Sequence, residues 1–304
     1  MVPTSNLSIR SIKSISLPGR SHPLTLEIDE LLNKIKTTAA EAVSAGAICS
    51  GLSQLSRLYK CMDDLLTSST TQVMMSCEQN KKWVDEFVDE SVKFLDVCGG
   101  ISDMISEIKG HYKDLLCSLR RRKGELSVEN SIMKYNCFRK KMKKDIKRLT
   151  GSLKQIDIII NGGGGGSMVV KSESDNHQLA AVIKAVIGVS EVTVLVFESL
   201  LMFICAPVSK PKKWSLGVSK LMHQGSVACE DQQENGDANE FERTDAALRI
   251  LHKNGFSSGM RNVQIVHCWL ERFGAQIESM EGGLECIFRC LVQTRVSLLN
   301  IISL

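Results

Sequence analysis

The sequence has little proline and few aromatic residues. Only 5 prolines occur in 304 residues, and aromatic side chains make up 5% of the chain. The turn signals that β-sandwiches and β-barrels need at short intervals are therefore missing. Hydrophobic residues make up 43% and charged residues 24%, which argues against a disordered chain. The composition favours a helical protein with ample length for a core.

Motifs of metal, redox and nucleophilic sites are also lacking. The eleven cysteines include no CxxC pair, and the six histidines include no HxxxH pair. His267 and Cys268 are adjacent, so on a helix they point about 100° apart and do not face each other. Cys286 and Cys290 share a helix face but have no further ligands, and we interpret them as packing residues. We therefore expect no catalytic residue, no metal and no cofactor, and thus no enzyme.

The N-terminus lacks the continuous apolar stretch of a secretory signal, and the cysteines read as reduced thiols. We therefore expect an intracellular protein, either cytoplasmic or membrane-associated, that is not secreted. The arm formed by residues 1–22 is rich in serine and has no acidic residue, which resembles a plastid transit peptide. A chloroplast location is the alternative, and a flexible arm is the simpler interpretation.

No run of about 20 uncharged apolar residues is present, although a membrane-spanning helix would require one. The most apolar segment, residues 178–206, is interrupted by Lys184, Glu191 and Glu198. Because these three recur every seven residues, they lie on one helix face and leave the other sides apolar. We interpret the segment as the core helix of a bundle, with membrane contact as the alternative.

Apolar residues recur at helical spacing over most of the chain. The most regular pattern runs from Ile132 to Ile160 in alternating steps of 3 and 4, as in a coiled coil. Arg139 occupies one position of this seam, and we expect its stem on apolar neighbours and its charged head in solvent. Similar spacing predicts other helices, with a break at Gly282 and Gly283 that divides the C-terminal segment into two. Those other helices cover about residues 24–35, 48–66, 78–119, 178–206, 244–253, 263–280 and 284–302.

These patterns predict an all-α fold, a bundle of long antiparallel amphipathic helices. We expect a flexible arm over residues 1–22 and a single bundle domain over residues 23–304. A glycine-rich linker, 161–176, and a polar loop, 207–240, interrupt that domain. The linker lacks the Lys-Ser/Thr ending of a phosphate-binding loop, which makes that function improbable.

Charged residues gather in two regions. The acidic cluster Asp85, Glu86, Asp89 and Glu90 is interpreted as a solvated helix face, with cation binding as the alternative. Residues 120–148 hold 12 basic and 3 acidic side chains, a net charge of +9. Nucleic acid is an improbable partner, because interleaved aromatics and DNA- or RNA-binding motifs are missing, and an anionic membrane surface fits better. The candidate basic patch comprises Arg120, Arg121, Arg122, Lys123, Arg139, Lys140, Lys141, Lys143 and Lys144.

Blocks at both ends resemble a known plant family. KSISLPGRSHPLTLEIDE (residues 13–30) and GGLECIFRCLVQTRVSLLNII (residues 282–302) are similar to the BYPASS-like family, as are the block at residues 81–125 and VFESLLMFI (residues 196–204). The resemblance implies a role in root and shoot development, where the family's namesake restrains a root-derived mobile signal. No catalytic residues are implied.

Three functions follow as hypotheses: a non-enzymatic helical interaction protein of plant development, a peripheral membrane adaptor, and an enzyme of unrecognised type in signal metabolism.

Lys13 lies three residues before Ser16, and Pro18 follows two residues after it. This spacing predicts that Ser16 is a phosphosite in the N-terminal arm that 14-3-3 proteins recognise. The simpler interpretation is that residues 14–18 only lead into the first helix.

Overall fold

The computed structural model describes residues 23–39, 44–120, 125–160, 177–205, 239–254 and 260–304. The expected N-terminal arm, the glycine-rich linker and most of the polar loop lie outside this part of the chain. The predicted all-α class is confirmed, because helices occupy nearly all of the described residues. The helices are α1 (Pro23–Ala39), α2 (Ala45–Thr67), α3 (Ser69–Met75), a 3-10 turn η1 (Glu78–Asn80), α4 (Lys81–Arg120), α5 (Glu125–Ile160), α6 (His177–Cys205), α8 (Glu240–Asn254) and α9 (Met260–Ile302).

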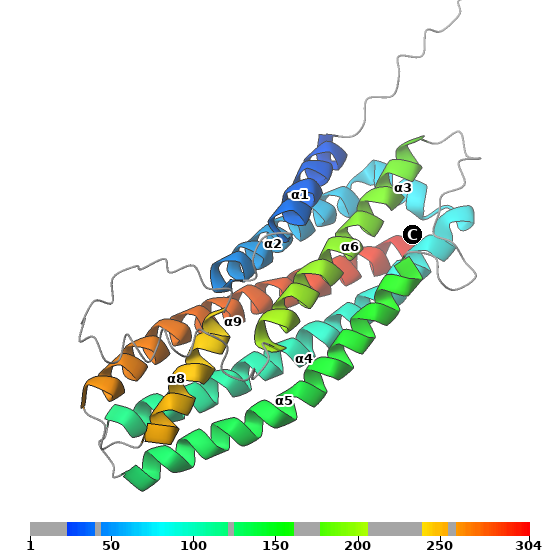
Figure 1. Ribbon diagram of the computed structural model, residues 1–304. Coiled ribbons are helices and arrows are strands. Elements are labelled where there is room, and N and C mark those ends of the chain that lie inside the picture. Colours follow the sequence, from blue (N-terminus) through cyan, green and yellow to red (C-terminus); the bar gives the residue numbers. More distant parts are fainter. Residues whose placement is uncertain (1–22, 40–43, 121–124, 161–176, 206–238, 255–259) are drawn as a thin grey trace, which may run out of the picture.

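The long helices form an elongated bundle (Figure 1). Helix α9 packs along both α4 and α2, α5 packs on the other side of α4, and α6 lies between the α1–α2 pair and α5. Helices α4 and α5 are antiparallel: Ser118 of α4 meets Ser131 of α5 near the connection between them. Pairs that are far apart in sequence include parallel ones. Ser56 contacts Cys286 and Asp63 contacts Ser297, so α2 and α9 run in the same direction.

Side-chain caps define where several helices begin. Ser44 precedes α2, and its hydroxyl accepts a hydrogen bond from the Ala47 amide at 3.2 Å. The Asn239 side chain does the same for Glu242 at 2.9 Å, at the start of α8. Such caps satisfy amides that have no partner inside the helix, and each stabilises a helix by about 1 kcal/mol.

The predicted seam of α5 is buried throughout, from Ile132 to Ile160. Helix α6 is long and apolar enough to cross a membrane, but 67% of its most apolar stretch is buried inside the bundle. Its one-sided charged stripe is visible in the structure, because Lys184 is exposed and Glu191 pairs with Lys36 of α1 at 2.9 Å. These observations support the interpretation of α6 as a core helix.

The C-terminal segment differs from the prediction. A break was expected at Gly282 and Gly283, whereas α9 is one continuous helix of 43 residues. Gly283 faces α2, and a Cβ atom there would lie 3.0 Å from Leu52. Packing against α2 therefore outweighs the propensity cost of about 1 kcal/mol per glycine. Helix α4 likewise continues through Gly99 and Gly100.

Candidate functional site

A basic face lies on the outer side of α5, which forms one edge of the bundle (Figure 1). Lys140, Lys144, Lys147 and Lys154 are all exposed and recur at helical spacing, opposite the buried seam. Arg148 is exposed beside them. We call these five residues the α5 basic face. Asp145 and Asp157, the acidic residues of the same stretch, lie on the sides of the helix that flank the seam.

Two exposed isoleucines follow the α5 basic face. Ile158 is 52% exposed and Ile159 is 41% exposed, at the C-terminal end of the helix. The outer side of α5 therefore carries positive charge along its length and apolar side chains at one end. A helix with cationic and apolar side chains on its exposed surface is suited to the interface of an anionic membrane.

The structure divides the predicted basic patch. Lys140, Lys141, Lys143 and Lys144 are exposed on α5. Arg120 turns away to α9, where it pairs with Glu271 and donates a hydrogen bond to His267 at 3.0 Å. Arg121, Arg122 and Lys123 lie outside the described residues. The predicted patch thus contributes two members to the α5 basic face, which also includes Lys147, Arg148 and Lys154.

The prediction for Arg139 is wrong, because its head is buried instead of solvated. The residue is 3% exposed, and its Nε and one terminal nitrogen donate to Asp245 Oδ2 at 3.1 and 2.8 Å. The other terminal nitrogen donates to the Ile204 carbonyl at 2.8 Å, and the guanidinium lies 4.3 Å from the centre of the Phe241 ring. These contacts give the cation a carboxylate, a carbonyl dipole and an aromatic face in place of water.

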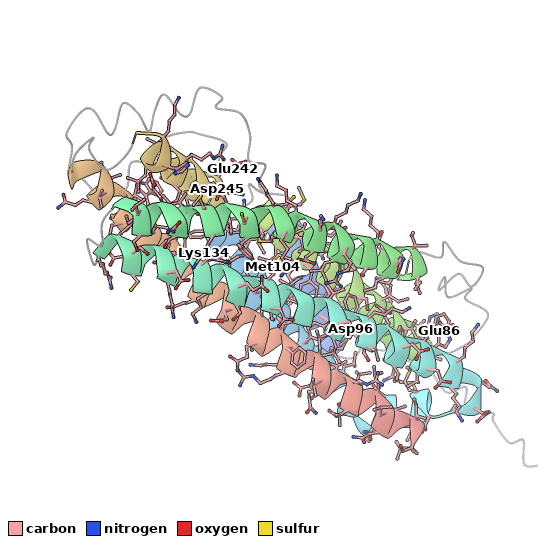
Figure 2. All side chains as sticks on the ribbon, turned by 90° about the horizontal axis from the view of Figure 1, so that it is seen from below. Glu86, Asp96, Met104, Lys134, Glu242 and Asp245 are labelled. Atoms are coloured by element: carbon pink, nitrogen blue, oxygen red, sulfur yellow. The ribbon has the colours of Figure 1, made fainter. Side chains whose placement is uncertain are left out.

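The Arg139 cluster joins three helices. Tyr135 of α5 donates a hydrogen bond to Asp245 Oδ1 at 2.6 Å, and Figure 2 shows Asp245 beside α5. Burial, followed by the Asp245 charge, raises the pKa of Tyr135 well above its usual value. Arg139 and Asn239 hold the Ile204 and Phe203 carbonyls at the end of α6. The cluster therefore fixes α5, the end of α6 and α8 to each other.

A second polar cluster lies where α2, α4, α6 and α9 meet. Glu90 was interpreted as part of a solvated face, but it is only 5% exposed, so that interpretation is wrong for this residue. Asp85 and Asp89 of the same run are exposed, as expected. Glu90 lines a cavity of about 30 Å³ together with hydroxyl groups from the other three helices. Burial raises the pKa of Glu90 to about 7.

An open groove of about 670 Å³ lies between α4 and α9 near Tyr112 and Gly274. Its charged rims are paired: Arg120 contacts Glu271 at one end, and Lys113 lies 3.5 Å from Glu278 at the other. Burial, followed by the charge of Glu271, raises the pKa of Tyr112 to about 12. The groove therefore has an apolar floor between two ion-paired rims, and its charges already have partners.

Ser56 of α2 contacts Cys286 at 3.0 Å and Cys290 at 3.8 Å, so the two thiols lie against a neighbouring helix. Burial raises the pKa of the Cys290 thiol, which keeps it protonated. This geometry is consistent with the interpretation of Cys286 and Cys290 as packing residues.

Comparison with known families gives one match. The model of the family Protein BPS1 matches residues 51–301, most of the chain. The chain belongs to this BYPASS-like family. No curated protein matches the chain, and no solved structure matches it.

The BPS1 match includes the α5 basic face, the Arg139 cluster and the Glu90 cavity. It also includes the central block at residues 81–125 and nearly all of the C-terminal block at residues 282–302. The N-terminal block at residues 13–30 lies outside the match. Ser16 lies in that block and outside the described residues.

Proposed function

We propose that this BPS1 family member is a non-enzymatic helical adaptor of plant root and shoot development that docks on an anionic membrane through the α5 basic face. Family membership supports the role in plant development. We place the adaptor in the process by which the family's namesake restrains a root-derived mobile signal. The observation that carries the docking function is the row of exposed cations on one side of α5.

The charge of this face is sufficient for reversible docking. Each basic residue close to an anionic leaflet contributes about 1 kcal/mol, so five contribute about 5 kcal/mol at low salt. Salt screens such contacts over about 10 Å at 0.1 M, so the attraction falls as ionic strength rises. A helix of 36 residues is about 54 Å long, and its outer side can lie flat on a surface. Exposed Ile158 and Ile159 supply apolar contact at one end.

The proposal that the protein is not an enzyme rests on where its buried ionisable side chains lie. Tyr59, Glu90 and Tyr135 have raised pKa values because helix packing buries them. Arg139 is held in the buried cluster with Asp245. Within the described part of the chain, Tyr59, Tyr135 and Arg139 each bond to a side chain of another helix, which supports an interaction protein.

Vesicle flotation tests the docking function. The intact chain is mixed with phosphatidylcholine vesicles that contain either no anionic lipid or about one third phosphatidylserine. We expect flotation only with the anionic vesicles, and loss of flotation in high salt. A variant with five Gln substitutions removes the α5 basic face: Lys140→Gln, Lys144→Gln, Lys147→Gln, Arg148→Gln and Lys154→Gln.

A control variant with the same net charge distinguishes the effect of the α5 basic face from the effect of total charge on vesicle binding. It carries five Gln substitutions on α1, α2, α4 and α9, namely Lys34→Gln, Lys60→Gln, Lys81→Gln, Lys82→Gln and Arg289→Gln, all at exposed positions. We expect the α5 variant to lose at least tenfold in vesicle affinity and the control to lose less than threefold. Equal losses in the two variants would contradict docking through α5, as would flotation of the wild type with neutral vesicles.

A further inference from the structure

Two buried polar side chains in the bundle core have no hydrogen-bond partner among the described residues. Both carboxylate oxygens of Glu90 on α4 are unpartnered, and this residue is 5% exposed. The hydroxyl oxygen of Thr294 on α9 is also unpartnered, and this residue is 4% exposed. Buried polar groups in folded proteins are nearly always hydrogen-bonded. Two exceptions at one place indicate that a bound species completes the site.

Glu90 and Thr294 line the same cavity, which has a volume of about 30 Å³. The hydroxyl-bearing residues Tyr59 of α2 and Ser190 of α6 line it as well, and the remaining walls are mostly apolar. A single water molecule needs about 10 to 15 Å³ of such space. The cavity therefore admits one or two particles of about the size of water.

The polar atoms of the cavity are oxygens. Two belong to the Glu90 carboxyl group, and the others are hydroxyl oxygens from three further helices. Tyr59 is already hydrogen-bonded to Thr193 at 3.0 Å, and burial raises its pKa, so it is neutral. Ser190 faces the Glu90 carboxyl group and lowers its pKa, although burial raises that pKa by more. Carboxylate and hydroxyl oxygens suit hard cations.

Positive charge is scarce around the carboxyl group. Lys93 on α4 is exposed and lowers the pKa of Glu90 only weakly, because burial outweighs it. Arg295 on α9 is nearby, but it donates to the Val88 carbonyl and to Ser91. The facing groups from α2, α6 and α9 are hydroxyls. With a pKa of about 7, Glu90 is ionised in a large fraction of molecules at neutral pH and then lacks an adjacent counter-ion.

We propose that the Glu90 cavity binds one monovalent cation of about the size of a water molecule, K⁺ or NH₄⁺. The Glu90 carboxylate supplies the matching single negative charge, and the Thr294 and Ser190 hydroxyls supply further oxygen ligands. One carboxylate is too few for Ca²⁺, which takes 6 to 8 oxygen ligands that include several carboxylates. A proton on Glu90 competes with the cation, so binding weakens as pH falls. This site is independent of the docking function of α5.

Thermal unfolding of the full chain tests the proposal. At pH 8, choline chloride is replaced stepwise by KCl, NH₄Cl or NaCl at constant ionic strength, because choline is too large for the cavity. A ligand at ten times its dissociation constant stabilises the folded state about elevenfold, which raises the melting temperature of a chain of this size by roughly 2 to 4 °C. We expect a saturating rise with KCl or NH₄Cl, a smaller one with NaCl, and none at pH 5.

Matched variants locate the effect. Glu90→Gln removes the charge and should abolish the rise, and Thr294→Val should weaken it. Glu86→Gln makes the same chemical change one turn earlier on α4, where Glu86 pairs with Lys82 near the end of the helix (Figure 2), and should retain the rise. The proposal is overturned if the wild type melts at the same temperature in potassium and choline at pH 8, which would indicate water alone. An equal rise in Glu90→Gln overturns it as well. If Glu90→Gln does not fold, the wild-type comparison between pH 5 and pH 8 decides.

Discussion

The buried pair Arg139–Asp245 gives the sharpest test of the packing described above. Asp245→Asn keeps the shape of the side chain but removes its charge. Arg139 would then remain 3% exposed, with its cation facing a neutral amide. Loss of one partner from a buried ion pair destabilises a protein by about 3 to 5 kcal/mol. Because natural domains have a free energy of unfolding of about 5 to 15 kcal/mol, this is a large fraction of the total.

Urea unfolding of the full chain measures the effect. We expect Asp245→Asn and Arg139→Met each to lower the free energy of unfolding by about 3 to 5 kcal/mol. The double variant should lose clearly less than the sum of the two, because it leaves neither charge unpaired. A surface pair is the control: Lys141 lies 3.7 Å from Glu107, both side chains are more than half exposed, and Lys141→Met should change stability by less than about 1 kcal/mol.

Two results would refute this reasoning about Arg139. One is strict additivity of the single variants, which would show that the two side chains do not interact. The other is a cost of Asp245→Asn no larger than that of Lys141→Met. The same variants distinguish the effect of Arg139 on stability from membrane docking, because a folded Arg139→Met chain should still float with anionic vesicles.

Four further predictions follow. In potassium-free buffer, the contribution of Glu90 to stability should fall as pH rises, because its pKa of about 7 in the folded chain exceeds its usual 4.5 and the folded state binds the proton more tightly between these values. Relative to Glu90→Gln, the wild type should lose roughly 2 to 3 kcal/mol in free energy of unfolding between pH 5 and pH 8, and a constant difference would contradict this. Gly274→Ala would place a methyl group against the buried Tyr112 ring and should lower the free energy of unfolding by about 1 to 3 kcal/mol. Gly282→Ala has no atom within 4 Å and should be neutral or stabilising. Equal melting temperatures of the two variants would show that the close approach at Gly274 is unimportant. Truncation after Gly283 removes buried side chains worth about 1.5 to 3 kcal/mol each and should unfold the chain, which an unchanged circular dichroism melt would disprove. A peptide of the N-terminal arm phosphorylated at Ser16 should bind a 14-3-3 protein more tightly than the unphosphorylated peptide in fluorescence anisotropy, and equal affinity ends that hypothesis.

Local periodicity was sufficient to predict most of the helices. The seam from Ile132 to Ile160 and the apolar sides of α6 follow directly from 3.6-residue spacing, because each helix must bury its apolar side somewhere. The same spacing predicted a helix over residues 78–119, and α4 runs from Lys81 to Arg120. The charge excess of residues 120–148 predicted a basic patch, of which Lys140, Lys141, Lys143 and Lys144 are exposed on α5.

Long-range contacts explain what the sequence did not predict. The environment of Arg139 depends on Asp245, which is 106 residues away, so no local pattern indicates that its head is buried. Glu90 belongs to an acidic run whose other members are solvated, and only the approach of three other helices buries it. The break expected at Gly282 and Gly283 fails for the same reason, because α2 packs closely against Gly283.

The position of α9 has a consequence for synthesis of the protein. Helix α9 is translated after the other described helices, yet it packs between two of the earliest, α2 and α4. At 5 to 20 residues per second, roughly 10 to 40 s pass between translation of the end of α4 and translation of the end of α9. Throughout that time the apolar sides of α2 and α4 lack their partner. The nascent chain must therefore be shielded, by chaperones or by temporary pairing of its own helices, until α9 has emerged from the ribosome.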